Sequence, residues 1–187
     1  MTVTGQIAAA VMTVTMLAGC AGPVGQDTPD KTESKPKLAP IILRPDGVSQ
    51  GKGLRFPYGT RKTEVIAMLE RFGPVDQNTN EECGAGPMDS AFSPTTGLTV
   101  NFQGNELVGW FLNGDGKLAR TAQDITVGST RAALEEAMPL EMQTDSTLGI
   151  EFFSGSEEAG FIGGLLTDES DDATVDSLYS GTNCFFR

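Results

Sequence analysis

The chain has 187 residues and is acidic, with 25 Asp and Glu against 13 Lys and Arg and a formal net charge of −12 at pH 7. It contains no histidine, which excludes Ser-His-Asp and Cys-His catalytic arrangements. The acidic balance also argues against nucleic acid as a ligand, because phosphate binding needs basic patches.

The first predicted element is an apolar, uncharged run over residues 7–19. It is shorter than the ~20 apolar residues that a membrane-spanning helix needs, so it predicts a signal peptide over residues 1–19. The run ends in LAGC, which resembles the lipobox of bacterial lipoproteins. That resemblance implies that Cys20 starts the mature chain and carries acyl chains such as palmitate. An ordinary signal peptide, or a buried N-terminal helix with a free cysteine, is the alternative.

The lipobox resemblance also implies a cellular location. In such lipoproteins an Asp directly after the lipidated cysteine resembles an inner-membrane retention signal, and this chain has Ala21 there. The expected location is the bacterial cell envelope, with the protein anchored in the outer membrane and facing the periplasm. Residues 20–45, which open on a stretch rich in Pro, Gly, Lys, Asp and Thr, are expected to form a flexible tether. Residues 46–187 are expected to form a single domain.

Two cysteines remain if Cys20 carries lipid. Cys83 and Cys184 then form an even pair in an oxidising compartment, which predicts a disulfide. The bond would close a loop of about 100 residues, worth ~4.7 kcal/mol in the chain-entropy model. A redox-active or metal-binding pair is the alternative. The pair lacks CxxC spacing and the chain lacks histidine, so neither a metal site nor a cofactor is predicted.

Two segments of the expected domain repeat one helical plan. Residues 58–74 place apolar side chains at i, i+3, i+4 and i+7, with Thr60 as the cap and a Gly-Pro pair as the stop. Residues 127–139 repeat the pattern with Ser129 as the cap. Each segment is followed by an alternating stretch that predicts a β-hairpin, over residues 97–112 and 149–166.

These elements predict an α+β fold. Two tandem helix-plus-β-hairpin repeats, over residues of about 54–120 and 121–187, are expected to form an antiparallel sheet with its helices packed on one face. The first helical segment, with Gly59-Thr60, Glu64-Val65, Leu69 and Gly73-Pro74, is similar to the signature of small outer-membrane assembly lipoproteins of the small-protein-A type. It is also similar to the repeats of the β-lactamase inhibitor protein fold. The resemblance implies the fold rather than one function, because related folds serve as inhibitors, as assembly factors and as lipoproteins of other kinds.

Charge and aromatic residues suggest where a partner binds. Residues 121–187 carry 13 Asp and Glu against 2 Lys and Arg, which favours a protein partner with a basic surface, or divalent cations. The acidic stretch 168–176 lacks the regular spacing of a calcium loop and is interpreted as a solvated loop. Four aromatic residues are candidate interface residues, and core packing is the alternative for each. They are Trp110, Phe111, Phe185 and Phe186.

The sequence therefore predicts a membrane-anchored envelope lipoprotein that binds a protein or organises the outer membrane, and that is not an enzyme. Two alternatives stay open. One is an inhibitor-like binder of an envelope enzyme. The other is a carboxylate-dependent hydrolase, because a chain with so many acids can bring two carboxylates together in its fold.

Overall fold

The computed structural model describes residues 38–114 and 117–185, which contain two helices and twelve strands. The predicted signal peptide, Cys20 and most of the expected tether lie outside these residues. The elements are β1 (Ile41–Arg44), β2 (Gly47–Gln50), β3 (Leu54–Pro57), α1 (Lys62–Glu70), β4 (Asp76–Asn80), β5 (Met88–Ser93), β6 (Leu98–Gln103), β7 (Glu106–Asn113), β8 (Ala119–Thr121), α2 (Arg131–Ala137), β9 (Glu141–Gln143), β10 (Ile150–Ser156), β11 (Gly160–Leu166) and β12 (Val175–Gly181). Neither helix is long and apolar enough to cross a membrane.

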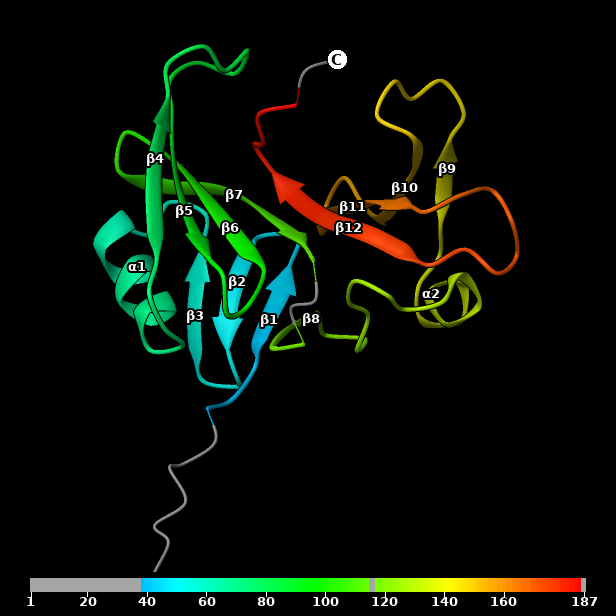
Figure 1. Cartoon of the computed structure of the whole chain (residues 1–187), viewed down its shortest axis with the longest axis horizontal. Helices are drawn as coiled ribbons and strands as arrows, with labels where there is room; N and C mark the ends of the chain where they lie inside the picture. The colour runs from blue at the N-terminus through cyan, green and yellow to red at the C-terminus, as the bar shows by residue number, and fades with distance from the viewer. Residues whose placement is uncertain (1–37, 115–116, 186–187) are drawn as a thin grey trace, which may run out of the picture. The chain divides into compact units, whose positions relative to one another are not determined.

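The predicted α+β fold class is wrong, because the described chain is mostly β. Its strands form an eight-stranded antiparallel sheet in the order β4-β5-β6-β7-β12-β11-β10-β9 and a four-stranded sheet in the order β3-β2-β1-β8 (Figure 1). The helices have only nine and seven residues. Helices of this length bury too little surface to cover a sheet of eight strands, so much of the core is covered by the second sheet.

The predicted hairpins are present, but each belongs to a longer run of strands. Gly104 and Asn105 form the turn between β6 and β7 with φ of 58° and 67°, the left-handed geometry that suits a two-residue hairpin turn. β10 and β11 form the second hairpin. Each helix is followed by four antiparallel strands, β4 to β7 or β9 to β12, rather than by a hairpin alone.

The two halves share the way in which each helix begins. Gly59 and Gly128, each three residues before a helix, have φ of 88° and 83°. The amide of Gly59 donates to the carbonyl of Leu107 on β7, and that of Gly128 donates to the carbonyl of Val175 on β12, both at 2.8 Å. β7 and β12 are neighbours, so the halves meet through their last strands at the centre of the sheet.

The predicted helix caps differ from those observed. The hydroxyl of Thr60 donates to the carbonyl of Pro57, and α1 begins after Arg61 with no side-chain cap. α2 is capped by Thr130, whose Oγ1 accepts the amide of Ala133 at 3.2 Å, rather than by Ser129. In both cases the helix begins one residue later than the sequence pattern indicates.

The four-stranded sheet begins inside the stretch that was expected to be tether. β1 lies between β2 and β8, and its Ile41 and Leu43 are buried in the main core. Burial of the apolar Ile-Ile-Leu run offsets the conformational entropy that is lost when this segment becomes ordered. A polar tether has no apolar surface to bury and stays without such compensation. The ordered sheet therefore starts at residue 41, five residues before the expected start of the domain.

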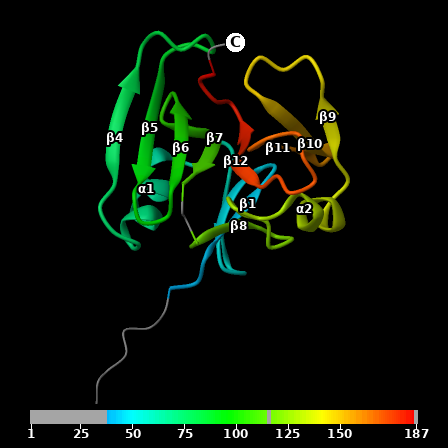
Figure 2. The same ribbon diagram turned by 45° about the vertical axis from the view of Figure 1, so that its right-hand side comes forward.

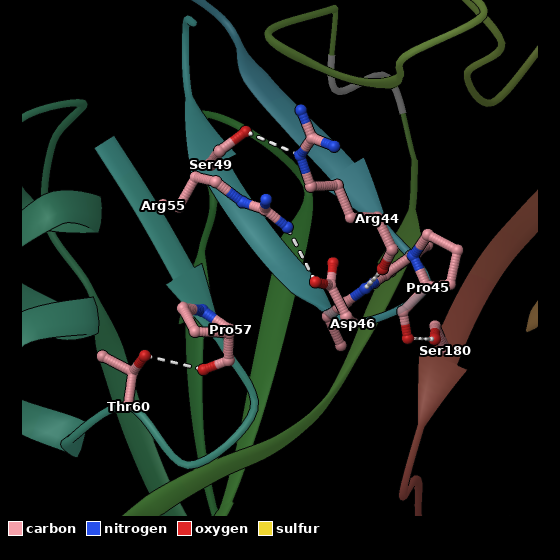
Figure 3. Close-up of polar contacts among 9 residues, drawn as sticks. Arg44, Pro45, Asp46, Ser49, Arg55, Pro57, Thr60 and Ser180 are labelled. Carbon is pink, nitrogen blue, oxygen red and sulfur yellow. Dashed lines mark hydrogen bonds and ion pairs between the residues drawn. The ribbon is translucent and has the colours of Figure 1, made fainter. Parts of the chain in front are cut away.

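The turn between β1 and β2 joins the small sheet to the centre of the large one. The indole Nε1 of Trp110 on β7 donates to the carbonyl of Arg44, and the hydroxyl of Ser180 on β12 donates to the carbonyl of Pro45, both at 2.8 Å. Arg55 and Asp46 form an ion pair at 2.7 Å beside this turn (Figure 3). These contacts hold the two sheets together where the halves meet.

Candidate functional site

Alternation along the strands gives the eight-stranded sheet two chemically different faces. On β6, Leu98, Val100 and Phe102 are buried in the core, while Thr99 and Asn101 point to the other side. We call this other side the outer face. Its central positions on the paired strands are Asn78, Asn80, Met88, Ser90, Phe92, Thr99, Asn101, Phe111, Tyr179, Phe153 and Phe161.

One line of directly paired residues crosses all eight strands on the outer face. In strand order it runs Asp76, Phe92, Thr99, Phe111, Tyr179, Gly163, Phe153 and Glu141. We call its four rings, Phe92, Phe111, Tyr179 and Phe153, the aromatic row. An acidic residue stands at each end, on the edge strands β4 and β9. Phe92, Phe111 and Phe153 are partly exposed and Tyr179 is buried, so the outer face presents three partly exposed rings on a line that ends in a carboxylate on each side.

Tyr179 lies at the centre of the aromatic row and is held firmly. Its hydroxyl donates to Oε1 of Glu151, which is fully buried on β10. A Cβ at Gly163, on the neighbouring strand, would lie 2.5 Å from the Tyr179 ring, so only glycine leaves room for that ring. The ring of Phe153 meets the Tyr179 ring edge-on, with centroids 6.2 Å apart. These contacts fix the row on a rigid sheet.

The C-terminal tail, residues 182–185, turns back over the outer face. In both views it rises between the β4–β5 turn and the β9–β10 turn (Figures 1 and 2). The ring of Phe185 packs edge-on against Tyr179 and Phe111, with centroid distances of 4.8 and 5.9 Å. The side-chain amide of Asn101 donates to the carbonyl of Thr182 at 3.3 Å. The tail thus adds a fifth ring to the aromatic row.

A hollow of about 400 Å³ lies on the outer face beside the tail. It has a polar floor of amides and hydroxyls and two aromatic walls, and none of its lining residues is acidic or basic at neutral pH. They are Asn78, Asn80, Met88, Ser90, Thr99, Asn101, Phe111, Asn183, Cys184 and Phe185. Such a hollow can accept apolar groups and can exchange hydrogen bonds with a neutral polar segment.

The charge of the large sheet is all of one sign. Its eight strands contain six acidic residues and no Lys or Arg. The turns that rise beside the tail add Glu81, Glu82 and Asp145, all exposed. Lys and Arg occur instead on the small sheet and at the helices, as in Arg55 and Lys62.

On the outer face itself, the carboxylates of Asp76 and Glu141 are exposed and that of Glu151 is buried. Asp89 lies on the opposite side of the sheet and pairs with Lys62 at 2.9 Å. The two exposed carboxylates and those of the turns attract cations and basic groups.

The two cysteines of the expected disulfide lie together at the edge of the hollow. Cys83 is buried in the β4–β5 turn, and the thiol of Cys184 accepts a hydrogen bond from the amide of Asn80 at 3.3 Å. Both are free thiols in this structure. A hydrogen bond with the Cys83 thiol raises the pKa of Cys184 above its usual value. The structure brings the pair into contact, and the disulfide itself stays a prediction.

The four predicted interface residues do not lie together on one surface. Trp110 is fully buried in the core and cannot meet a partner. Phe111 is partly exposed on the outer face, and Phe185 packs beside it in the tail. Phe186 and Cys20, the predicted lipidation site, lie outside the described residues. Phe92, Phe153 and Tyr179 were not predicted as interface residues, because their shared line depends on the pairing register of distant strands.

Most of the acidic stretch 168–176 lies in the connection between β11 and β12, where residues 168–172 are exposed and Ala173 is buried, and its last two residues begin β12. The carboxylate of Asp168 accepts the amide of Ser170 at 2.8 Å, and its pKa is lowered by hydrogen bonds from Ser170. Within residues 38–114 and 117–185, no group of three or more Cys, Asp or Glu side chains is placed to hold a metal ion. This connection has the geometry of a solvated acidic loop.

Comparisons with known protein families, with curated proteins and with solved structures found no significant match to this chain. The resemblance to outer-membrane assembly lipoproteins therefore stays a prediction from a short motif.

Proposed function

We propose that this protein is a membrane-anchored envelope lipoprotein whose outer face binds a protein partner with a basic surface. The aromatic row carries the proposal. Aromatic rings on a rigid sheet lose little freedom on binding and are the side chains most often found at interface hot spots. Here they stand on a sheet whose strands carry six acidic residues and no basic ones.

Charge complementarity selects the partner class. Asp76 and Glu141 stand at the two ends of the row, so Lys or Arg side chains of a partner can pair with them while its apolar groups cover the rings. Arg and Lys also bind favourably over the face of an aromatic ring. An acidic partner, or an anionic lipid surface, would be repelled by the same carboxylates.

The proposed place of action follows from the N-terminal sequence. Acylation of Cys20 would anchor the chain permanently, since one acyl chain alone binds a membrane only marginally and several together bind it stably. Residues between Cys20 and the first strand at Ile41 would let the sheet reach a partner away from the bilayer. A role in outer-membrane organisation is consistent with that arrangement.

A second candidate function is inhibition of an envelope enzyme. The hollow beside Phe111 and Phe185 favours it, because a concave face with exposed rings can receive a protruding loop of an enzyme. The binding surface is the same in both candidates. The two candidates differ in what binding does to the partner. Only an inhibitor would abolish the catalytic activity of its partner.

Site-specific photo-crosslinking in whole cells tests the proposal. A photoreactive residue replaces either Phe161, on the outer face and 41% exposed, or Leu54, on β3 and 51% exposed. These two are the exposed large apolar residues of the described chain, so they form a matched pair. We expect one protein to crosslink from position 161 and not from 54, through a peptide with net positive charge. Crosslinking from both positions, or through an acidic peptide, would contradict the proposal.

A further inference from the structure

The C-terminal tail is built into the binding hollow but is weakly attached to the sheet. It supplies Asn183, Cys184 and Phe185 to the lining. Its amide at Thr182 donates to the carbonyl of Val108 at 2.8 Å, and its other described polar contacts run through side-chain amides and a thiol. Chain ends held by so few backbone hydrogen bonds open readily. In this structure both thiols are free and the tail still lines the hollow, so a covalent link would shift the opening equilibrium rather than create the hollow.

The position of Thr182 shows how closely the tail follows the sheet. A Cβ placed on Gly109 of β7 would lie 2.0 Å from the carbonyl oxygen of Thr182, so the glycine lets the tail backbone lie directly on the strand. From there Asn101 and Asn80 hold the next residues, and Asn80 reaches the thiol of Cys184. The tail ends beside the β4–β5 turn, which contains Cys83.

We propose that a disulfide between Cys83 and Cys184 acts as a redox clasp, which stabilises the closed hollow by holding the tail on the outer face and which, on reduction, lets the tail open more readily. Cys83 is fixed, because it is buried in a turn closed by a hydrogen bond from the amide of Gly86 to its carbonyl at 2.9 Å. Cys184 is partly exposed and belongs to the weakly attached tail. Oxidation would therefore tie a cysteine of the tail to one that is fixed in a turn.

The chemistry is thiol–disulfide exchange with a small disulfide such as oxidised glutathione. The Cys184 thiolate attacks one sulfur of glutathione disulfide, and a glutathione thiolate leaves. The Cys83 thiolate then attacks the Cys184 sulfur and releases the second glutathione thiolate. Two cysteine thiols lose two electrons and two protons, one S–S bond forms in the protein, and one S–S bond breaks in glutathione. Cys184 reacts first because Cys83 is buried, and the raised pKa of the Cys184 thiol means that the exchange should be faster at alkaline pH.

The clasp would regulate the same site that the proposed function uses. Opening removes Phe185 from the aromatic row and removes three lining residues from the hollow. The effect on partner binding rests on the proposed function. The disulfide and the release of the tail do not rest on it, and they can be measured on the protein alone.

Peptide mapping and hydrogen exchange on the full chain test the clasp. After equilibration with oxidised glutathione and blocking of free thiols, trypsin without reductant should yield residues 72–117 joined to residues 132–187, since it cuts after Arg71, Lys117 and Arg131. Hydrogen exchange in residues 182–185 should be at least tenfold faster after reduction. Exchange in the core strands β6 and β7 should not change.

Three variants provide the controls. Cys83→Ser and Cys184→Ser should both exchange like the reduced protein, whether or not oxidant is present. Gly109→Ala should speed tail exchange even in the oxidised state, because its Cβ displaces Thr182. No joined peptide in the oxidised chain, or equal tail exchange in the two redox states, would overturn the clasp. Either result would leave the crosslinking test from position 161 unaffected, so failure of the clasp and failure of the proposed function can be told apart.

Discussion

Tyr58 connects three parts of the chain through one hydroxyl group. It follows β3, and its hydroxyl donates to Oγ of Ser180 on β12 at 2.9 Å. Ser180 donates in turn to the carbonyl of Pro45 in the β1–β2 turn (Figure 3). Burial raises the pKa of Tyr58 from 10.0 to about 12, the hydrogen bond from Tyr58 to Ser180 lowers it in part, and the nearby Asp46 raises it further. The folded state therefore favours the protonated, neutral form of the Tyr58 side chain.

This raised pKa predicts a loss of stability in alkali. Between pH 10 and 12 the unfolded chain releases the Tyr58 proton while the folded chain keeps it, so the free energy of unfolding falls as pH rises. The contribution is present below pH 10 and is lost by about pH 12. Its size is about 2 kcal/mol once the remaining solvent contact of the ring is allowed for.

Urea unfolding of the wild type and of Tyr58→Phe at pH 9 and pH 11.5 measures the effect. The variant lacks the titrating group, so its stability should fall less between the two pH values than that of the wild type. Equal falls for both proteins would show that the hydroxyl is solvated in the folded state. The comparison cancels the other groups that titrate in this range, because the two proteins share them.

Helix α2 depends on its cap, because seven residues are too few to form a stable helix alone. Thr130→Ala removes the acceptor for the amide of Ala133 and should lower the free energy of unfolding by about 1 kcal/mol. Thr130→Ser should restore most of it. Arg61→Ala, at the matching position before α1, should change it little, since Arg61 makes no side-chain cap. Equal losses in Thr130→Ala and Arg61→Ala, measured by urea unfolding, would disprove a capping role.

The strands that were predicted from the sequence are those with a strong local signal. The β6–β7 and β10–β11 hairpins combine alternating side chains with Gly-rich turns, which fix their pairing over a few residues. β4 has the sequence DQNTN, with no apolar residue to mark it as a strand. It is ordered by pairing with β5, which is a tertiary effect. β1 was assigned to the tether because a three-residue apolar run is too short to show a periodicity.

The candidate site was harder to predict than its parts. The adjacency of Trp110 and Phe111 correctly indicated that one faces the core and the other the opposite side. The aromatic row needs the register of β7 against β12, whose residues Phe111 and Tyr179 are 68 positions apart in the sequence. The hollow needs the tail to return over the sheet. Neither feature has a signature in a short window of sequence.

In the described part of the chain, Lys and Arg are absent from the large sheet, whereas acidic residues also occur on the helices, as in Glu64 and Glu135. The eight-stranded sheet and its turns are acidic, and the Lys and Arg residues of the described chain lie on the small sheet, its connections and the helices. The sheet thereby offers one face with aromatic rings and negative edges, while the opposite face is used for the core. Association with a basic partner should then be steered by charge and should weaken as salt rises.

The most direct measurement is calorimetric titration of the crosslinked partner into the wild type, Phe161→Ala and Leu54→Ala at low and moderate salt. The account predicts about tenfold weaker binding for Phe161→Ala, wild-type affinity for Leu54→Ala, and weaker binding of every protein at moderate salt. Equal affinities for the two variants, or binding that strengthens with salt, would contradict the claim that the outer face binds a basic protein.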